Sequence, residues 1–161
     1  MTGRILVGHD GSPNSEAALD AAIDEAEARR ADLDVITVWR VPLLVDPYSI
    51  RVEMIHTEHA AEASVDAAAL RAERRLGRPV GRRVVPGSPR AVLTDEATHY
   101  DLVVVGAKGC HGIPGLRLGS VARHLAHSCP VPLLIVPPPS RQPDVEHRTS
   151  PSTSTACSPV A

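Results

Sequence analysis

Five short apolar runs constrain the fold of this 161-residue chain more than any other feature. None of them alternates strictly between polar and apolar residues, so each predicted strand is expected to be buried on both faces. Strands of this kind are typical of a parallel sheet that is covered by helices on both sides. The predicted strands cover residues 4–8, 33–39, 80–85, 101–106 and 131–136.

The segments between these strands predict helices, because their apolar residues recur at helical spacing. In the first segment, Ser12 can cap the helix and Pro13 suits its first position. Pro42 and Pro47 predict a loop before the second helix. Right-handed crossovers then favour a doubly wound, five-stranded parallel α/β sheet in the order 3-2-1-4-5, with helices on both faces. The helices are expected at 12–30, 52–76, 87–100 and 120–128, and the loop at 41–51.

Composition limits the function and the location. The formal net charge is −2 and the pI is about 6.4, so no overall basic field points to nucleic acid. Residues 71–90 hold seven arginines and one glutamate, which predicts either a nucleic-acid patch or, as we favour, a solvated helix end and a guarded strand edge. No apolar run is long enough to cross a membrane. Three widely spaced cysteines favour a reducing cytoplasm.

The chain is expected to divide into one folded domain and a tail. Residues 1–137 are long enough for a single domain with a full core. Residues 138–161 are rich in Pro, Ser and Thr and lack apolar periodicity. Such a composition predicts a disordered segment.

A glycine cluster follows the fourth predicted strand. The stretch GAKGCHGIPGLRLGS, residues 106–120, holds five of the eleven glycines and Lys108, the only lysine. Successive backbone N–H groups in such a loop can bind an anion, and the helix that Ser120 opens adds a positive N-terminal end. A compact ammonium group at Lys108 suits phosphate oxygens. These features predict a polyphosphate site, although a flexible glycine loop without a ligand is equally compatible with glycine content alone.

The spacing of the glycines carries a family resemblance. Gly106-x2-Gly109-x9-Gly119-Ser120 resembles the nucleotide-binding signature of the universal stress protein family. The segments HDGS after the first strand, DLVVVGAKG around the fourth and CPVPLLIV at the fifth are similar to the family's motifs and follow its order. The resemblance covers about residues 2–137. It implies the sheet order 3-2-1-4-5 and the binding of ATP or a related adenine nucleotide, with Mg²⁺ and with no metal held by protein side chains alone.

The resemblance also implies residue roles. Asp10 is expected to bind the ribose hydroxyls, Gly8 to let the chain pass close to the nucleotide, and Val38 to pack on the adenine. The residues expected along the phosphates are Gly106, Ala107, Lys108, Gly109, Gly119, Ser120 and Val121. His9 stands where the family usually has an apolar residue. It is expected either to contact the base edge or the next loop, or to be a tolerated substitution, which we favour.

Three functions stay open at this point. The first is an ATP-binding stress-response regulator, and the second is a slow ATPase or phosphotransferase. An ATPase or phosphotransferase needs a well-placed general base, and only His9 and His111 are candidates near the predicted site. The third is an interaction protein with no nucleotide. Cys110 is expected to be a bystander rather than a reactive thiol. The charge-free fifth strand, residues 131–136, predicts a homodimer, in agreement with the resemblance.

Overall fold

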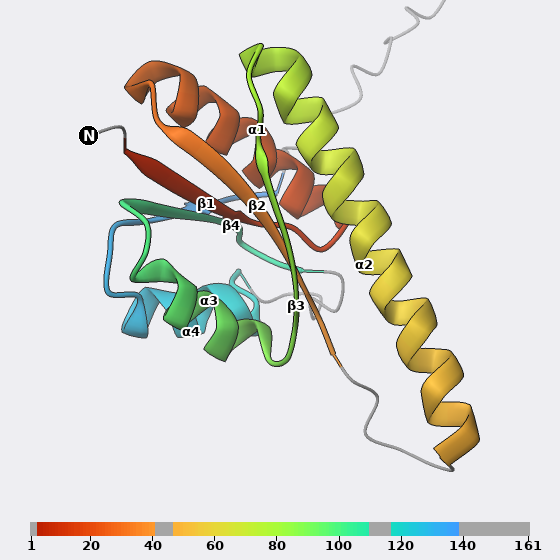
Figure 1. The fold of residues 1–161 in the computed structure, drawn as a ribbon. Coiled ribbons are helices and arrows are strands. Elements are labelled where there is room, and N and C mark those ends of the chain that lie inside the picture. The colour runs from red at the N-terminus through yellow and green to blue at the C-terminus, as the bar shows by residue number, and fades with distance from the viewer. Residues whose placement is uncertain (1–2, 41–46, 110–116, 139–161) are drawn as a thin grey trace, which may run out of the picture.

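The computed structural model describes residues 3–40, 47–109 and 117–138, and for residues 47–57 it describes the backbone alone. Its centre is a five-stranded, all-parallel sheet with the strand order β3-β2-β1-β4-β5 (Figure 1). The strand order expected from the sequence is therefore confirmed. The strands are β1 (Arg4–Gly8), β2 (Asp32–Trp39), β3 (Gly81–Pro86), β4 (Leu102–Gly106) and β5 (Leu133–Val136).

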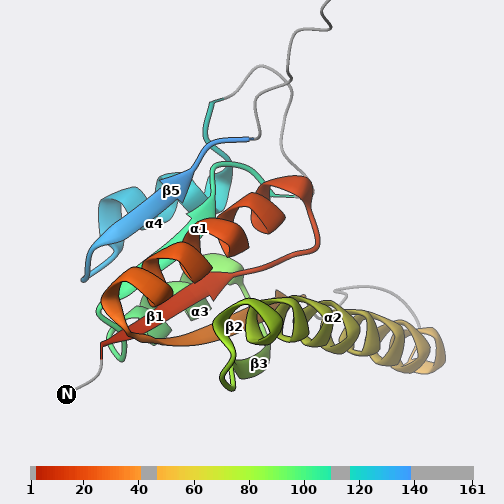
Figure 2. The same cartoon turned by 90° about the horizontal axis from the view of Figure 1, so that it is seen from above.

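Four helices cover the sheet, α1 and α2 on one face and α3 and α4 on the other (Figure 2). As expected, Ser12 caps α1, because its side chain accepts a hydrogen bond from the backbone N–H of Ser15, and Pro13 follows at the first helical position. Figure 1 shows the N-terminal half of α2 projecting past the end of β2. The helices are α1 (Pro13–Arg29), α2 (Pro47–Leu76), α3 (Pro89–Ala97) and α4 (Ser120–Ser128).

The core is aliphatic on both faces of the sheet. Val7 and Val35 belong to the cluster beneath α1 and α2, whereas Leu6 and Ile36 belong to the cluster beneath α3 and α4. Successive strand residues therefore point to opposite faces, and both faces are buried. This explains why the predicted strands read as continuous apolar runs.

Several predicted boundaries were wrong, and two of them have a clear physical reason. Helix α2 begins at Pro47, within the expected loop, because proline is tolerated in the first helical turn, where its missing N–H has no partner to lose. Strand β5 begins at Leu133 rather than at residue 131. Pro130 and Pro132 flank Val131 and lack the N–H donors that pairing with β4 requires.

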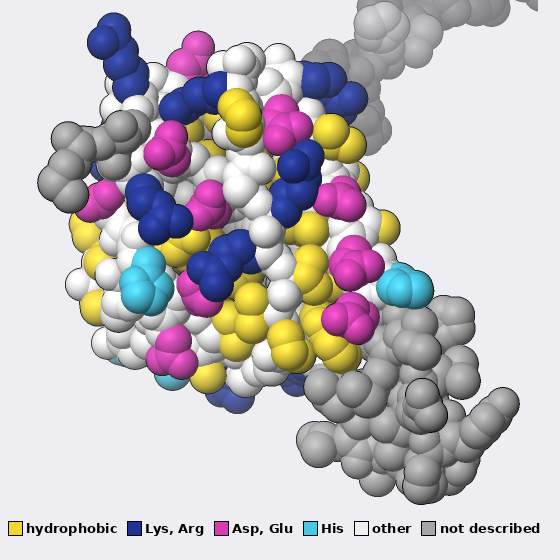
Figure 3. Space-filling view, viewed as in Figure 1, with side chains coloured by type: hydrophobic (Ala, Val, Ile, Leu, Met, Phe, Trp, Pro, Cys, Tyr) yellow, Lys and Arg dark blue, Asp and Glu magenta, His cyan; other side chains and the backbone are white. Residues whose placement is uncertain are grey.

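The arginines of the β3 edge are held by acidic residues of the flanking helices. Arg82 forms ion pairs with Asp66 and Glu73 of α2, and Arg83 forms one with Glu96 of α3. Figure 3 shows basic and acidic side chains interspersed on the face that carries β3. The edge strand therefore carries two ion-paired arginines, and the arginines do not form a continuous basic surface on this face. Among the described residues, no helix is both long and apolar enough to cross a membrane.

Candidate functional site

The site lies where the strand order reverses, at the ends of β1 and β4. These two strands pair in parallel, so they end at the same edge of the sheet. After β1 the chain turns to α1 on one face, and after β4 it leads to α4 on the other. In open α/β sheets this divergence is where ligands bind. We call residues 9–12 and 107–109 the switch-point loops.

The switch-point loops meet at Asp10 and Gly109. A Cβ atom added to Gly109 would lie 2.6 Å from Oδ2 of Asp10, closer than two such atoms approach without displacement. Oδ1 of the same carboxylate accepts a hydrogen bond from the backbone N–H of Ser12 at 3.0 Å. Gly11 between them has a φ of +77°, which side chains rarely adopt. The carboxylate of Asp10 is thus held at the surface, beside the glycine loop.

Two further glycines allow close backbone approach. A Cβ atom on Gly106 would lie 2.8 Å from the backbone carbonyl group of Asn14, so the first turn of α1 packs directly against the end of β4. Gly119 donates its N–H to the carbonyl oxygen of Ala107 at 2.7 Å. This bond closes the loop between β4 and α4 and places the start of α4 beside residues 107–109.

The start of α4 presents hydrogen-bond donors. Gly119 is the N-cap residue of α4, and because a glycine has no side chain, no side-chain bond caps the helix. Ser120 is the first helical residue, and it is exposed. The N–H groups of the first helical turn have no partner within a helix, and the helix dipole adds partial positive charge. Val121 packs half-buried against the core beneath α4.

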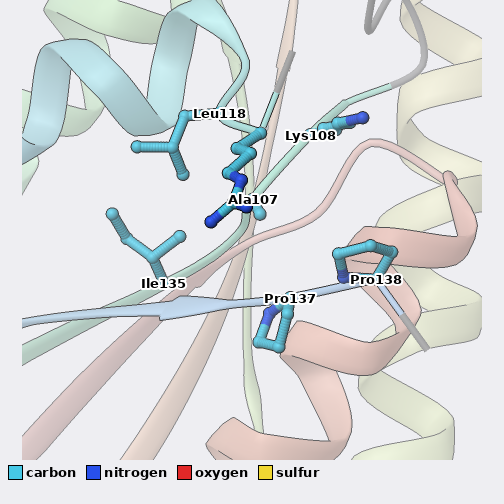
Figure 4. A pocket seen from close by; sticks show the side chains of 7 residues that line it. Ala107, Lys108, Leu118, Ile135, Pro137 and Pro138 are labelled. Atoms are coloured by element: carbon cyan, nitrogen blue, oxygen red, sulfur yellow. The ribbon is translucent and has the colours of Figure 1, made fainter. Parts of the chain in front are cut away.

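Lys108 lies between Ala107 and Gly109 in the loop after β4. Lys108, Leu118 and Ile135 are among the residues that line a cavity of about 430 Å³ beside β5, and Figure 4 shows the side chain of Lys108 pointing away from the other two. Lys108 is half-exposed, and no ion pair joins it to an acidic group of the described residues. Its ammonium group is therefore positioned as a candidate anion ligand at the switch point.

Gly8 and Val38 lie on the face covered by α3 and α4. Val38, near the end of β2, is half-buried and packs against the core cluster there. A Cβ atom on Gly8 would lie 3.3 Å from Cγ1 of Val105 and would crowd this apolar surface. The two residues are therefore placed where an apolar ring could pack beside the end of the sheet.

His9 has a role that the sequence did not predict. Its ring is turned toward α1 and α2, where Nδ1 lies 3.1 Å from Oγ of Ser64 and Nε2 lies 2.9 Å from Oε1 of Glu16. Both ring nitrogens therefore face side chains of these two helices. No local signal indicates the contact with Ser64, since 55 positions separate the two residues. Cys110 and His111, the other candidates in this region, lie outside the described residues.

The described side chains offer no metal centre. Within residues 3–40, 58–109 and 117–138, no group of three or more His, Cys, Asp or Glu side chains could hold a metal ion.

Comparisons with known proteins identify relatives of this chain. A universal stress protein of Mycolicibacterium smegmatis is 37% identical over 141 residues, which cover 83% of this chain and 45% of the relative. The chain thus spans less than half the length of this relative. Universal stress protein UspA from Lactobacillus plantarum superposes with a TM-score of 0.76 at 19% identity, covering 83% of this chain and 97% of that one.

A further related structure was solved with a bound nucleotide. A universal stress protein in complex with cAMP superposes with a TM-score of 0.62 at 29% identity, covering 85% of this chain and 98% of that one. The model of the universal stress protein family matches residues 1–137. Given this match and the sheet order, the chain belongs to the universal stress protein family.

Proposed function

We propose that this protein binds ATP, or a closely related adenine nucleotide, across the switch-point loops, and that binding regulates a response to stress. The observation that carries the proposal is the contact between Asp10 and Gly109, which brings an acceptor for ribose hydroxyls beside a loop suited to phosphates. A carboxylate is the usual acceptor for a ribose diol in α/β nucleotide sites. The relative of 29% identity that was solved with cAMP supports an adenine nucleotide.

Each part of the nucleotide has a proposed place. The ribose hydroxyls bind Asp10, and the adenine packs on Val38, with Gly8 leaving room for it. The phosphates follow the backbone from Gly106 to Gly109 and end at the first turn of α4, with Lys108 as their counter-charge. Mg²⁺ accompanies the phosphates. The residues proposed along them are Gly106, Ala107, Lys108, Gly109, Gly119, Ser120 and Val121.

A regulatory role is favoured over catalysis by the surroundings of the described titratable groups. A general base must reach the proton that it removes. Both ring nitrogens of His9 face side chains of α1 and α2, and its side chain is only 3% exposed. Asp10 is assigned to the ribose. Slow ATP hydrolysis is therefore the second candidate function, and His111→Ala in a turnover assay separates the two.

The proposed assembly is a homodimer through β5. This strand forms one edge of the sheet, its four residues are half-buried, and it carries no charged side chain. A half-buried apolar edge is a pairing surface unless another chain covers it. We further propose one domain over residues 1–137, a tail over 138–161 that adds nothing to the fold, and a reducing cytoplasm, where Cys129 stays unpaired.

One experiment tests the nucleotide proposal directly. Protein purified without added nucleotide is denatured, and the released small molecules are identified by mass spectrometry. Titration calorimetry with ATP, ADP, AMP and cAMP then ranks the ligands. We expect ATP or another adenine nucleotide to be released and to bind again. If none of the four nucleotides binds, the proposal is refuted. The remaining hypothesis is then an interaction protein that binds no nucleotide.

A further inference from the structure

His9 is a polar side chain buried at a position next to the proposed ribose ligand. Only 3% of its side chain is exposed, and it directly precedes Asp10. Burying an imidazole is costly unless its nitrogens are hydrogen-bonded. Here both nitrogens have partners, Ser64 on α2 at 3.1 Å and Glu16 on α1 at 2.9 Å. The ring therefore joins the end of β1 to both helices of this face.

The two partners determine how the ring is held. A carboxylate only accepts hydrogen bonds, so Nε2 must carry the hydrogen that is donated to Glu16. In the neutral ring, Nδ1 then accepts the hydroxyl hydrogen of Ser64. This arrangement satisfies both nitrogens and fixes the orientation of the imidazole.

Glu16 is itself held in place. Its second carboxylate oxygen pairs with Arg71 of α2, and Arg71 also pairs with Asp20 of α1. One turn further along, Arg75 pairs with Asp24 at 2.6 Å. The ring of His9 is therefore the first member of a polar row between α1 and α2, rather than an isolated contact.

The backbone of His9 is fixed as well. Its N–H donates to the carbonyl oxygen of Ile36 at 2.9 Å, which extends the pairing of β1 with β2 by one residue. After His9 the chain leaves the sheet, and Gly11 adopts a left-handed conformation. The direction in which Asp10 leaves the sheet thus depends on the residue before it, which is anchored by main chain and side chain together.

We propose that His9 is a positioning residue for ribose recognition: its ring, held by Ser64 and Glu16, sets the backbone from which the Asp10 carboxylate reaches the ribose hydroxyls. The inference rests on the proposed nucleotide function and assigns no contact between His9 and the nucleotide. It makes recognition of the ribose dependent on α2, which supplies Ser64. Apart from Gly8, which directly precedes His9, the residues proposed beside the adenine and the phosphates come from other segments.

The test compares ATP with 2′,3′-dideoxy-ATP, which lacks the hydroxyls assigned to Asp10. Titration calorimetry on the full chain should give a preference for ATP of about tenfold or more, since hydrogen bonds to a carboxylate are lost in the analogue. In His9→Val this preference should fall toward one, while the affinity for the dideoxy nucleotide stays within about twofold. If His9 had only a structural role, His9→Val would weaken the binding of both nucleotides to the same extent.

Three further variants sharpen the result. Ser64→Ala removes one partner and should lower the preference for ATP without abolishing it. His9→Gln, which can still donate toward Glu16, should restore part of the preference. His59→Gln changes an exposed histidine on the same helix as Ser64 and should behave as the parent. If His9→Val fails to fold, Ser64→Ala and His9→Gln still decide the question.

The outcomes separate this inference from the proposed function. A parent protein that prefers ATP, together with His9 and Ser64 variants that keep the full preference, would overturn the role of His9 and leave nucleotide binding intact. A parent protein that binds both nucleotides equally would refute the role of Asp10 and that of His9 with it. A parent protein that binds neither would refute the proposed function itself.

Discussion

The carboxylate of Asp10 lies directly against Gly109, so that a Cβ atom at residue 109 would sit 2.6 Å from Oδ2 of Asp10. The two residues are 99 positions apart and lie in the loops that follow β1 and β4, and the parallel pairing of these strands brings them together. A glycine is needed here because a side chain would push the carboxylate away. The contact links the proposed ribose ligand to the proposed phosphate loop.

Gly109→Ala is predicted to weaken nucleotide binding without reducing stability. The added methyl group displaces the exposed carboxylate of Asp10, but among the described residues, its chain neighbours aside, it meets no backbone atom within 4 Å. Titration calorimetry should show weaker ATP binding, and thermal unfolding should stay near that of the parent. Gly109→Val should weaken binding further.

Gly106→Ala, in contrast to Gly109→Ala, is predicted to reduce stability. Its methyl group would lie 2.8 Å from the backbone of Asn14, so α1 must shift. We expect a loss of about 1–3 kcal/mol, as for overpacked cores. Equal ATP affinity in the parent, Gly109→Val and Gly119→Val would remove the phosphate loop from the proposed site.

Asp10→Ala is predicted to weaken ATP binding by about 1.5–3 kcal/mol, the worth of hydrogen bonds to a charged group. Asp10→Asn should lose less, because the amide oxygen can still accept one bond. Both variants should keep the circular dichroism spectrum of the parent, since Asp10 is exposed. If Asp10→Ala binds ATP as tightly as the parent, the ribose is held elsewhere.

The fold was largely predictable from the sequence because its main signals are local. The strand order followed from five apolar runs and the handedness of crossovers, and the cap at Ser12 followed from adjacent residues. The start of α2 was missed because Pro47 reads equally as a loop residue and as the first residue of a helix.

The site was less predictable, because its contacts join distant segments. The glycine spacing indicated the loop, but the packing of Gly106 on Asn14 and of Gly109 on Asp10 required the sheet. His9 read as a substitution of no consequence, since its partner Ser64 lies on a helix that no pattern near His9 identifies. Side-chain partners across 55 positions leave no periodic trace in a single sequence.

Tyr100 is predicted to make stability decrease at alkaline pH. Burial, and the hydrogen bond that its hydroxyl donates to Asp34 at 2.6 Å, raise the pKa of Tyr100 above its usual value of 10.0. The unfolded chain therefore loses this proton near pH 10 while the folded chain keeps it. The contribution of Tyr100 to the free energy of unfolding is therefore fully present below pH 10. It is lost as the pH rises through the higher pKa of Tyr100 in the folded chain.

Urea unfolding measured from pH 8 to 11 tests this prediction. The chain has one lysine, two tyrosines and three cysteines whose side chains can titrate in this range, so the comparison between the parent and Tyr100→Phe isolates the contribution of Tyr100. Tyr100→Phe should be less stable than the parent at pH 8, by about 1.5 kcal/mol for a hydrogen bond to a carboxylate, and its stability should change less above pH 10. Tyr48→Phe is the control. Parallel pH profiles for the parent and Tyr100→Phe would contradict the assignment.

Removal of residues 138–161 is predicted to leave the domain intact. Their composition gives no apolar face that could pack on the sheet. The truncated chain should melt within about 2 °C of the parent, which corresponds to less than about 1 kcal/mol for a chain of this size. A fall of several degrees in differential scanning calorimetry would show that the tail docks on the domain.

Leu134→Arg is predicted to dissociate the proposed dimer. Leu134 lies within β5, packs half-buried beneath α1 and α2, and would carry a charge into an edge that has none. Two copies of β5 paired about a twofold axis would bring two such charges close together, in a poorly solvated interface. Light scattering at micromolar concentration should give a dimer for the parent and a monomer for the variant.

The opposite edge of the sheet supplies the control. Val84 of β3 is also half-buried and packs against the same core cluster, so Val84→Arg should cost comparable stability but leave the dimer intact. Thermal unfolding of both variants separates a loss of folding from a loss of association. A monomeric parent protein would refute the dimer. A dimeric parent protein with a dimeric Leu134→Arg variant would place the interface away from β5, and dissociation by Val84→Arg alone would place it at β3.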